Sequence, residues 1–197
     1  GLHHITAITA DAPGNVDFHV RVLGQRLVKK TVNFDEPSVY HLYYGDESGT
    51  PGSILTFFEF PGAPLGRAGA GMVHAIRWRV GSAASIAWWE DRLARLGVEA
   101  LRTDAGGLAF ADPEGLGHEL VVAGGSDAPL AARAADIPGE HALQGFDGVR
   151  AFASVPAASA PLLASLGFTA ADAPGAWRLG GAERHAWYLF DEPPSER

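Results

Sequence analysis

Cysteine is absent from this sequence of 197 residues, and so is any long uninterrupted apolar run. Without cysteine there are no disulfides and no thiolate chemistry, which fits a reducing compartment, so we expect a cytoplasmic protein. No window resembles a spanning helix of ~20 apolar residues, and we expect no membrane partner. Basic residues are also scarce, and the formal net charge of −8 argues against nucleic acid as a partner. We therefore expect a small-molecule partner.

One short phrase opens three similar segments of the chain. His4, His74 and Asp147 stand at equivalent points of the three phrases, 70 and 73 residues apart. Each phrase is followed by a short helical pattern that ends on Leu-Gly, and three extended runs come after it. The phrases occupy residues 2–6, 72–76 and 145–149. A repeat of this kind can build a metal site where two units meet, because it places an imidazole or carboxylate at the same point of successive strands.

The order of the predicted elements in each segment is βαβββ. We therefore predict an α+β fold in which three βαβββ units pair into curved, open-barrel sheets. The predicted boundaries are 1–66, 67–125 and a degenerate third unit at 145–197, with a linker at 126–144 rich in Ala, Gly and Asp. An odd number of units leaves one without a partner, because an open four-stranded sheet must cover its apolar face.

Strand alternation places His74 on one face with Ile76 and Trp78, which predicts that His74 points inward. His4 occupies the equivalent position in the first unit. A single histidine on an apolar face is more often a hydrogen-bonded core residue than a metal ligand. The repeat favours ligation for both, because the two imidazoles occupy equivalent positions.

Glu119 is the best carboxylate partner, because an acidic side chain between apolar neighbours in a strand needs a counter-charge or a cation. The alternative is that Glu119 faces solvent at a sheet edge. Two imidazoles and one carboxylate suit a non-haem Fe(II) centre, and the same ligands also suit Mn(II). A rival site would combine Asp147 with His74, Glu119 and His185. Otherwise Asp147 is a surface or capping residue.

Three other histidines are interpreted as structural or exposed residues. These are His19, His118 and His141. A run of aromatic residues at 40–60 is dense enough to line a pocket for an aromatic ligand, although the core of a strand looks much the same.

The repeat and its opening phrase resemble the vicinal oxygen chelate superfamily, whose paired βαβββ proteins include glyoxalase I, extradiol dioxygenases and bleomycin-resistance proteins. A narrower resemblance is to the hydroquinone-type ring-cleaving dioxygenases. It rests on Gly1-Leu2-His3-His4-Ile5-Thr6, on Leu27-Val28-Lys29-Lys30-Thr31-Val32-Asn33-Phe34-Asp35, on Tyr40-His41-Leu42-Tyr43-Tyr44-Gly45-Asp46 and on Asp112-Pro113-Glu114-Gly115-Leu116.

This resemblance implies an Fe(II) enzyme that cleaves a para-dihydroxylated aromatic ring and inserts both atoms of O₂. It also implies that His4 is the first iron ligand and that His3 and Thr6 lie near the substrate. Such enzymes have four units, in which unit one pairs with unit four and unit two with unit three, and their remaining ligands come from the fourth. Three units are visible here.

Three arrangements are therefore open. The chain is a fragment, or two chains complete each other as a homo-oligomer, or unit one pairs with unit two and uses His74 and Glu119. The leading functional hypothesis is an Fe(II)-dependent ring-cleaving dioxygenase. The alternatives are a non-catalytic protein that binds an aromatic compound, and a metal-dependent lyase or isomerase of the glyoxalase type.

Overall fold

The computed structural model describes residues 1–124, 127–181 and 184–195. Its N-terminal strands form a four-stranded sheet in the order β1-β4-β3-β2. The strands of this sheet are β1 (His4–Thr9), β2 (Arg26–Val32), β3 (Tyr40–Gly45) and β4 (Ile54–Glu59). Strand β1 runs parallel to β4, and it has no other neighbour among the described strands. One edge of this sheet is therefore open.

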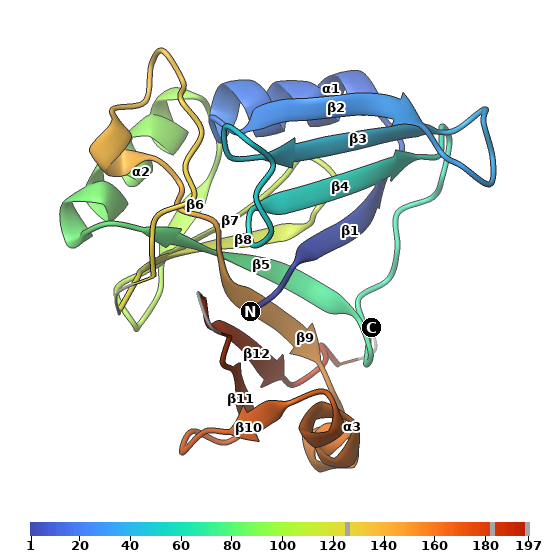
Figure 1. The fold of residues 1–197 in the computed structure, drawn as a ribbon, viewed down its shortest axis with the longest axis vertical. Helices are drawn as coiled ribbons and strands as arrows, with labels where there is room; N and C mark the ends of the chain where they lie inside the picture. The colour runs from blue at the N-terminus through green and yellow to red at the C-terminus, as the bar shows by residue number, and fades with distance from the viewer. Residues whose placement is uncertain (125–126, 182–183, 196–197) are drawn as a thin grey trace.

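The second sheet has eight strands in the order β10-β11-β12-β9-β5-β8-β7-β6. Its two halves are the second and third βαβββ repeats, and they meet where β5 pairs antiparallel with β9. The strands are β5 (Val73–Val80), β6 (Ala100–Arg102), β7 (Leu108–Ala111), β8 (Gly117–Val122), β9 (Phe146–Phe152), β10 (Phe168–Ala170), β11 (Ala176–Leu179) and β12 (Ala186–Asp191). Figure 1 shows the third repeat at the end farthest from the four-stranded sheet.

The helical segments are short, and most lie at the points where the sequence predicts them. They are α1 (Ala12–Val16), the π-helix η1 (Asp17–Val22), α2 (Ala83–Arg95), the 3₁₀ segments η2 (Gly139–His141) and η3 (Pro156–Ser159), and α3 (Ala160–Ser165). The side chain of Ser82 caps α2 by accepting the N–H of Ser85. Gly24 follows the end of η1 and Gly97 follows the end of α2, with φ of 70° and 74°, a conformation that favours glycine.

One hydrophobic core joins the first two repeats. The inner face of the four-stranded sheet contributes Leu42 and Phe57, and the second repeat contributes Trp78, Trp89 and other residues to the same cluster. All four of these side chains are at most 1% exposed. The first repeat therefore packs against the second through a shared interior, although their strands belong to separate sheets.

The α+β fold with open sheets is confirmed. The pairing of the second repeat with the third excludes, for the described residues, the arrangement in which unit one pairs with unit two. The predicted unit boundaries stay predictions. The boundary at 125–126, and residues 182–183 and 196–197 of the predicted third unit, lie outside the described residues. No helix in the described part of the chain is long and apolar enough to cross a membrane.

Candidate functional site

His4 lies on the open strand β1, on the face of the sheet that is turned away from the core. Both His4 and Thr6 are exposed, whereas Ile5 and Ala7 of the same strand pack against the core cluster. The prediction that His4 points inward is therefore wrong for this chain. The alternation holds, but the apolar interior lies on the other side of β1.

Two hydrogen bonds fix the polar side chains of this strand. Nδ1 of His3 lies 3.1 Å from Nδ1 of His4, and the hydroxyl of Thr56 on β4 donates to Oγ1 of Thr6 at 3.0 Å. When His4 donates through Nδ1, its Nε2 keeps a lone pair, which is the tautomer that a metal-binding histidine needs. Because Oγ1 of Thr6 accepts from Thr56, the hydroxyl proton of Thr6 can be donated to an atom on the exposed face of the sheet.

An aromatic surface lies beside these residues on the same face. The ring of His41 lies against Phe58, tilted by 31° with 3.8 Å between centroids, and its Nδ1 is 2.9 Å from the hydroxyl of Tyr43. Burial, followed by the charges of Lys29 and His4, lowers the pKa of His41. The predicted aromatic run is thus divided between the two faces, because Tyr44 and Phe57 are buried in the core.

His74 does not share a face with Ile76 and Trp78. Those two are 0% and 1% exposed in the core, whereas Nε2 of His74 lies 2.8 Å from Oδ2 of Asp191 and its ring stacks on Phe152. The pairing of β5 with β9 shifts register between Val73 and Ala75, so strict alternation does not hold at His74. This irregularity explains why the predicted orientation is wrong.

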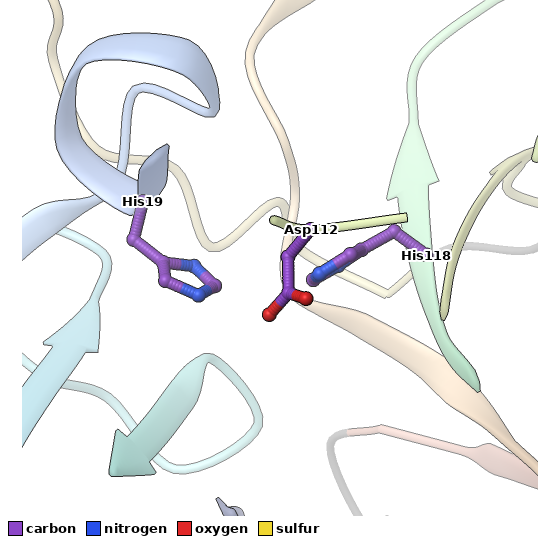
Figure 2. A group of neighbouring side chains, drawn as sticks. All are labelled: His19, Asp112 and His118. Carbon is purple, nitrogen blue, oxygen red and sulfur yellow. The ribbon is translucent and has the colours of Figure 1, made fainter. Parts of the chain in front are cut away.

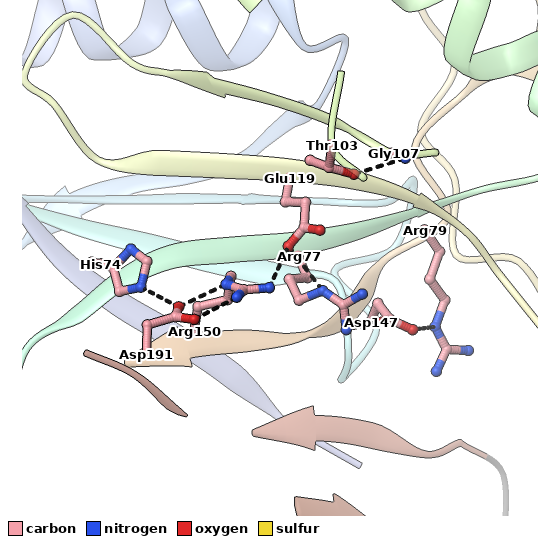
Figure 3. Close-up of polar contacts among 9 residues, drawn as sticks. All are labelled: His74, Arg77, Arg79, Thr103, Gly107, Glu119, Asp147, Arg150 and Asp191. Carbon is pink, nitrogen blue, oxygen red and sulfur yellow. Dashed lines mark hydrogen bonds and ion pairs between the residues drawn. The ribbon is translucent and has the colours of Figure 1, made fainter. Parts of the chain in front are cut away.

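Glu119 is almost fully buried and is held by two arginines. Its Oε2 accepts from Arg77 at 3.1 Å and lies 3.5 Å from Arg150, which also binds Asp191 (Figure 3). Glu119 therefore has cationic partners from the protein itself, and the alternative that it faces solvent at a sheet edge is wrong.

Asp147 belongs to the same network of ion pairs. It is only 6% exposed, its Oδ2 lies 2.7 Å from Arg77, and its Oδ1 lies 3.7 Å from Arg79. The interpretation of Asp147 as a surface or capping residue is wrong. His185, the remaining member of the rival site, pairs instead with Asp127 at 2.8 Å.

The structure does not bring His4, His74 and Glu119 together. Among the described residues a different group of three metal-binding side chains clusters together, and β1 and β5 lie in separate sheets. Of the three expected ligands, the described residues place His4 alone on the open face of β1. They do not by themselves fit a complete iron site.

The group that is found consists of His19, Asp112 and His118, which sequence reasoning missed. Each offers one ligand atom, and these atoms lie within 4.8 Å of one another. Figure 2 shows the two imidazoles and the carboxylate converging from separate segments. The available signal was the alternation of β8, which places His118 on the same face as the buried Leu120. His19 gave no such signal in its own segment, and it meets His118 only because the first repeat packs against the second.

Comparison with known proteins gives consistent results. The sequence model of the family described as "Glyoxalase/Bleomycin resistance protein/Dioxygenase superfamily" matches residues 1–120. The chain is 40% identical over 169 residues to the "Putative ring-cleaving dioxygenase MhqO" of Bacillus subtilis, covering 84% of this chain and 54% of that protein. It is 41% identical over 128 residues to the "Chlorohydroquinone/hydroquinone 1,2-dioxygenase" of Sphingobium indicum, covering 61% of this chain and 40% of that protein.

A solved structure resembles the whole chain. The crystal structure of a putative dioxygenase from Bacillus subtilis matches with a TM-score of 0.87 at 34% identity, covering 100% of this chain and 65% of that one. The chain thus spans about half the length of the curated relatives that it matches.

Proposed function

Because this chain belongs to the Glyoxalase/Bleomycin resistance protein/Dioxygenase superfamily, we propose that it forms part of an Fe(II)-dependent dioxygenase that cleaves hydroquinone-like aromatic rings. The names of its relatives at about 40% identity support the reaction class. The single observation that carries the proposal is the exposed His4, whose Nδ1 is hydrogen-bonded to His3 on an open strand edge.

In this proposal His4 supplies one ligand to the iron, for which Mn(II) is the alternative. His3 holds the tautomer of His4 that keeps Nε2 available. Thr6, fixed by Thr56, donates its hydroxyl proton to an oxygen of the bound substrate. The adjacent rings of His41 and Phe58 extend the same face and offer an apolar surface to an aromatic substrate.

We further propose that another βαβββ unit of the same polypeptide pairs along β1 and brings the remaining ligands. The pairing of β5 with β9 shows how two repeats join within this chain, through their first strands. Strand β1 is the corresponding first strand of the first repeat, and it is an edge in the described structure. The greater length of the relatives leaves room for such a unit.

The proposal is tested by loading the protein with Fe(II) without oxygen and then measuring O₂ uptake with a substituted hydroquinone. The chain should be compared with the longer polypeptide in which a further unit follows. We expect uptake in the longer form and its loss in His4→Ala, because the iron then lacks a ligand. Arg102→Met, an exposed residue far along the chain, is the matched control and should leave uptake unchanged.

Three results would each contradict a part of the proposal. Full uptake in His4→Ala would mean that His4 is not a ligand. Tight binding of the hydroquinone without any O₂ uptake, in an iron-loaded longer form, would instead indicate a binding protein. Uptake by the chain alone, together with a dimer in native mass spectrometry, would assign the missing unit to a second copy.

A further inference from the structure

A second group of potential ligands lies deep between the first two repeats and is separate from His4. His19 comes from η1 of the first repeat, while Asp112 follows β7 and His118 lies in β8 of the second. Their exposed fractions are 0%, 8% and 1%. Three polar side chains from two repeats therefore meet in the interior, where polar groups need partners.

Both imidazoles present an unpartnered nitrogen to this point. Nδ1 of His19 lies 2.8 Å from Oε1 of Gln25, which can only accept, so Nδ1 carries the proton and Nε2 keeps its lone pair. Nε2 of His19 and Nε2 of His118 are both buried without a hydrogen-bond partner among the described residues. These two unpartnered nitrogen atoms indicate a ligand independently of the clustering of the three side chains.

Asp112 supplies a carboxylate oxygen to the same place. Its Oδ1 accepts the N–H groups of Glu114 at 2.9 Å and Leu116 at 2.8 Å, which leaves Oδ2 available.

We propose that His19, Asp112 and His118 form a structural site for one divalent transition-metal ion, with Zn²⁺ as the best match. Two imidazoles and a carboxylate are ligands that zinc takes, and a water in the fourth position would complete the tetrahedron. Zinc–nitrogen bonds of about 2.0–2.1 Å place tetrahedral ligand atoms roughly 3.4 Å apart, and the three ligand atoms here all lie within 4.8 Å of one another. The burial of all three leaves no access for an aromatic substrate.

Trp78 limits the affinity of this site. Its Nε1–H donates to Nδ1 of His118 at 3.0 Å, so the neutral His118 carries its proton on Nε2. Binding of a metal at Nε2 moves that proton to Nδ1, where it faces the indole N–H and the hydrogen bond is lost. The loss of one such bond weakens binding by about tenfold. The same geometry would also suit a single water, which can accept from His118 and donate to His19.

The experiment is a titration of the chelator-treated chain with Zn²⁺ by calorimetry, and with Co²⁺ by absorption spectroscopy. It is done in a His3→Ala/His4→Ala background, which removes the exposed imidazole pair. We expect one bound ion per chain, a rise in Tm with Zn²⁺ and the intense absorption of tetrahedral Co²⁺. His118→Leu should abolish all three signals. Leucine is chosen because it suits the apolar face of β8.

Trp78→Phe provides an independent test, because it removes the opposing indole N–H and leaves all three ligands in place. This variant should bind Zn²⁺ about tenfold more tightly than the parent protein. No bound ion and no metal-dependent rise in Tm, in both the parent and Trp78→Phe, would overturn the proposal and assign the cluster to an internal water. Unchanged binding in His118→Leu would overturn it equally.

Discussion

Arg92 joins helix α2 of the second repeat to the end of η1 in the first, and its removal should destabilise the protein. The guanidinium is buried and donates to the backbone carbonyls of Val22 at 3.0 Å and Arg21 at 2.6 Å. These carbonyls belong to the last turn of η1, where no further helical N–H is available to them. Arg92, on the helix of the second repeat, therefore supplies the hydrogen bonds that the last carbonyl groups of η1 in the first repeat need.

The perturbation is Arg92→Met, which keeps the packing of the aliphatic stem and removes the charged donors. A hydrogen bond from a charged group contributes about 1.5–3 kcal/mol, so two such bonds give an expected loss of about 3–6 kcal/mol. For a chain of this length we expect a fall in Tm of about 10–20 °C. Urea unfolding followed by circular dichroism measures the loss of free energy directly.

Arg102→Met is the matched control, because it makes the same exchange where Arg102 and Glu90 are 43% and 42% exposed. Exposed ion pairs contribute little, so its unfolding midpoint should equal that of the wild type. Hydrogen exchange adds a local measurement, since the amides of Leu23 and Gln25 are bonded within this turn. An Arg92→Met midpoint equal to that of the control would refute the reasoning.

Two further predictions concern other contacts. Burial raises the pKa of Asp127, but the hydrogen bonds from Arg79 and from the backbone of His185 outweigh it and lower the pKa to about 2. Since this lies below the ordinary value of 3.8, ionised Asp127 contributes about 2 kcal/mol to the free energy of unfolding above pH 4, and this contribution is lost as the pH falls towards 2. Urea unfolding should therefore show Asp127→Asn to be less stable than the wild type by this amount at pH 7. At pH 2 the two proteins should be equally stable. In Gly148→Ala the new Cβ would lie 2.2 Å from the carbonyl oxygen of Trp187, so we expect a loss of about 1–3 kcal/mol and faster proteolysis of the third repeat. Gly66→Ala, where nothing lies within 4 Å, should show neither effect.

The parts of the fold that the sequence predicts are those encoded locally. The phrases at 2–6 and 72–76 contain the starts of strands β1 and β5, and Gly24 and Gly97 end the helices that follow these strands. The family resemblance carried by the first phrase is confirmed by the match over residues 1–120. These signals survive because alternation, helix ends and turns depend on neighbours in the chain.

The parts that sequence reasoning missed depend on contacts between repeats. His74 is turned by an irregular pairing with β9, which lies about 75 residues farther along the chain. Asp147 is buried because Arg77 and Arg79 of another strand neutralise it. His19 and His118 each look unremarkable in their own segment, and they meet only because two repeats share one core. The predicted roles of His3, His4 and Thr6 stay predictions.

The shared core also determines when the apolar face of the first repeat can be buried while the chain is being synthesised. Leu42 and Phe57 leave the ribosome well before Leu120, which helps to cover the same interior. At about 5–20 residues per second, the roughly 60 residues between β4 and Leu120 take about 3–12 s to be made. During this interval the apolar face of the first sheet lacks its cover while β1 remains an unpaired edge. The nascent first repeat is therefore a natural substrate for chaperones that bind exposed apolar strands.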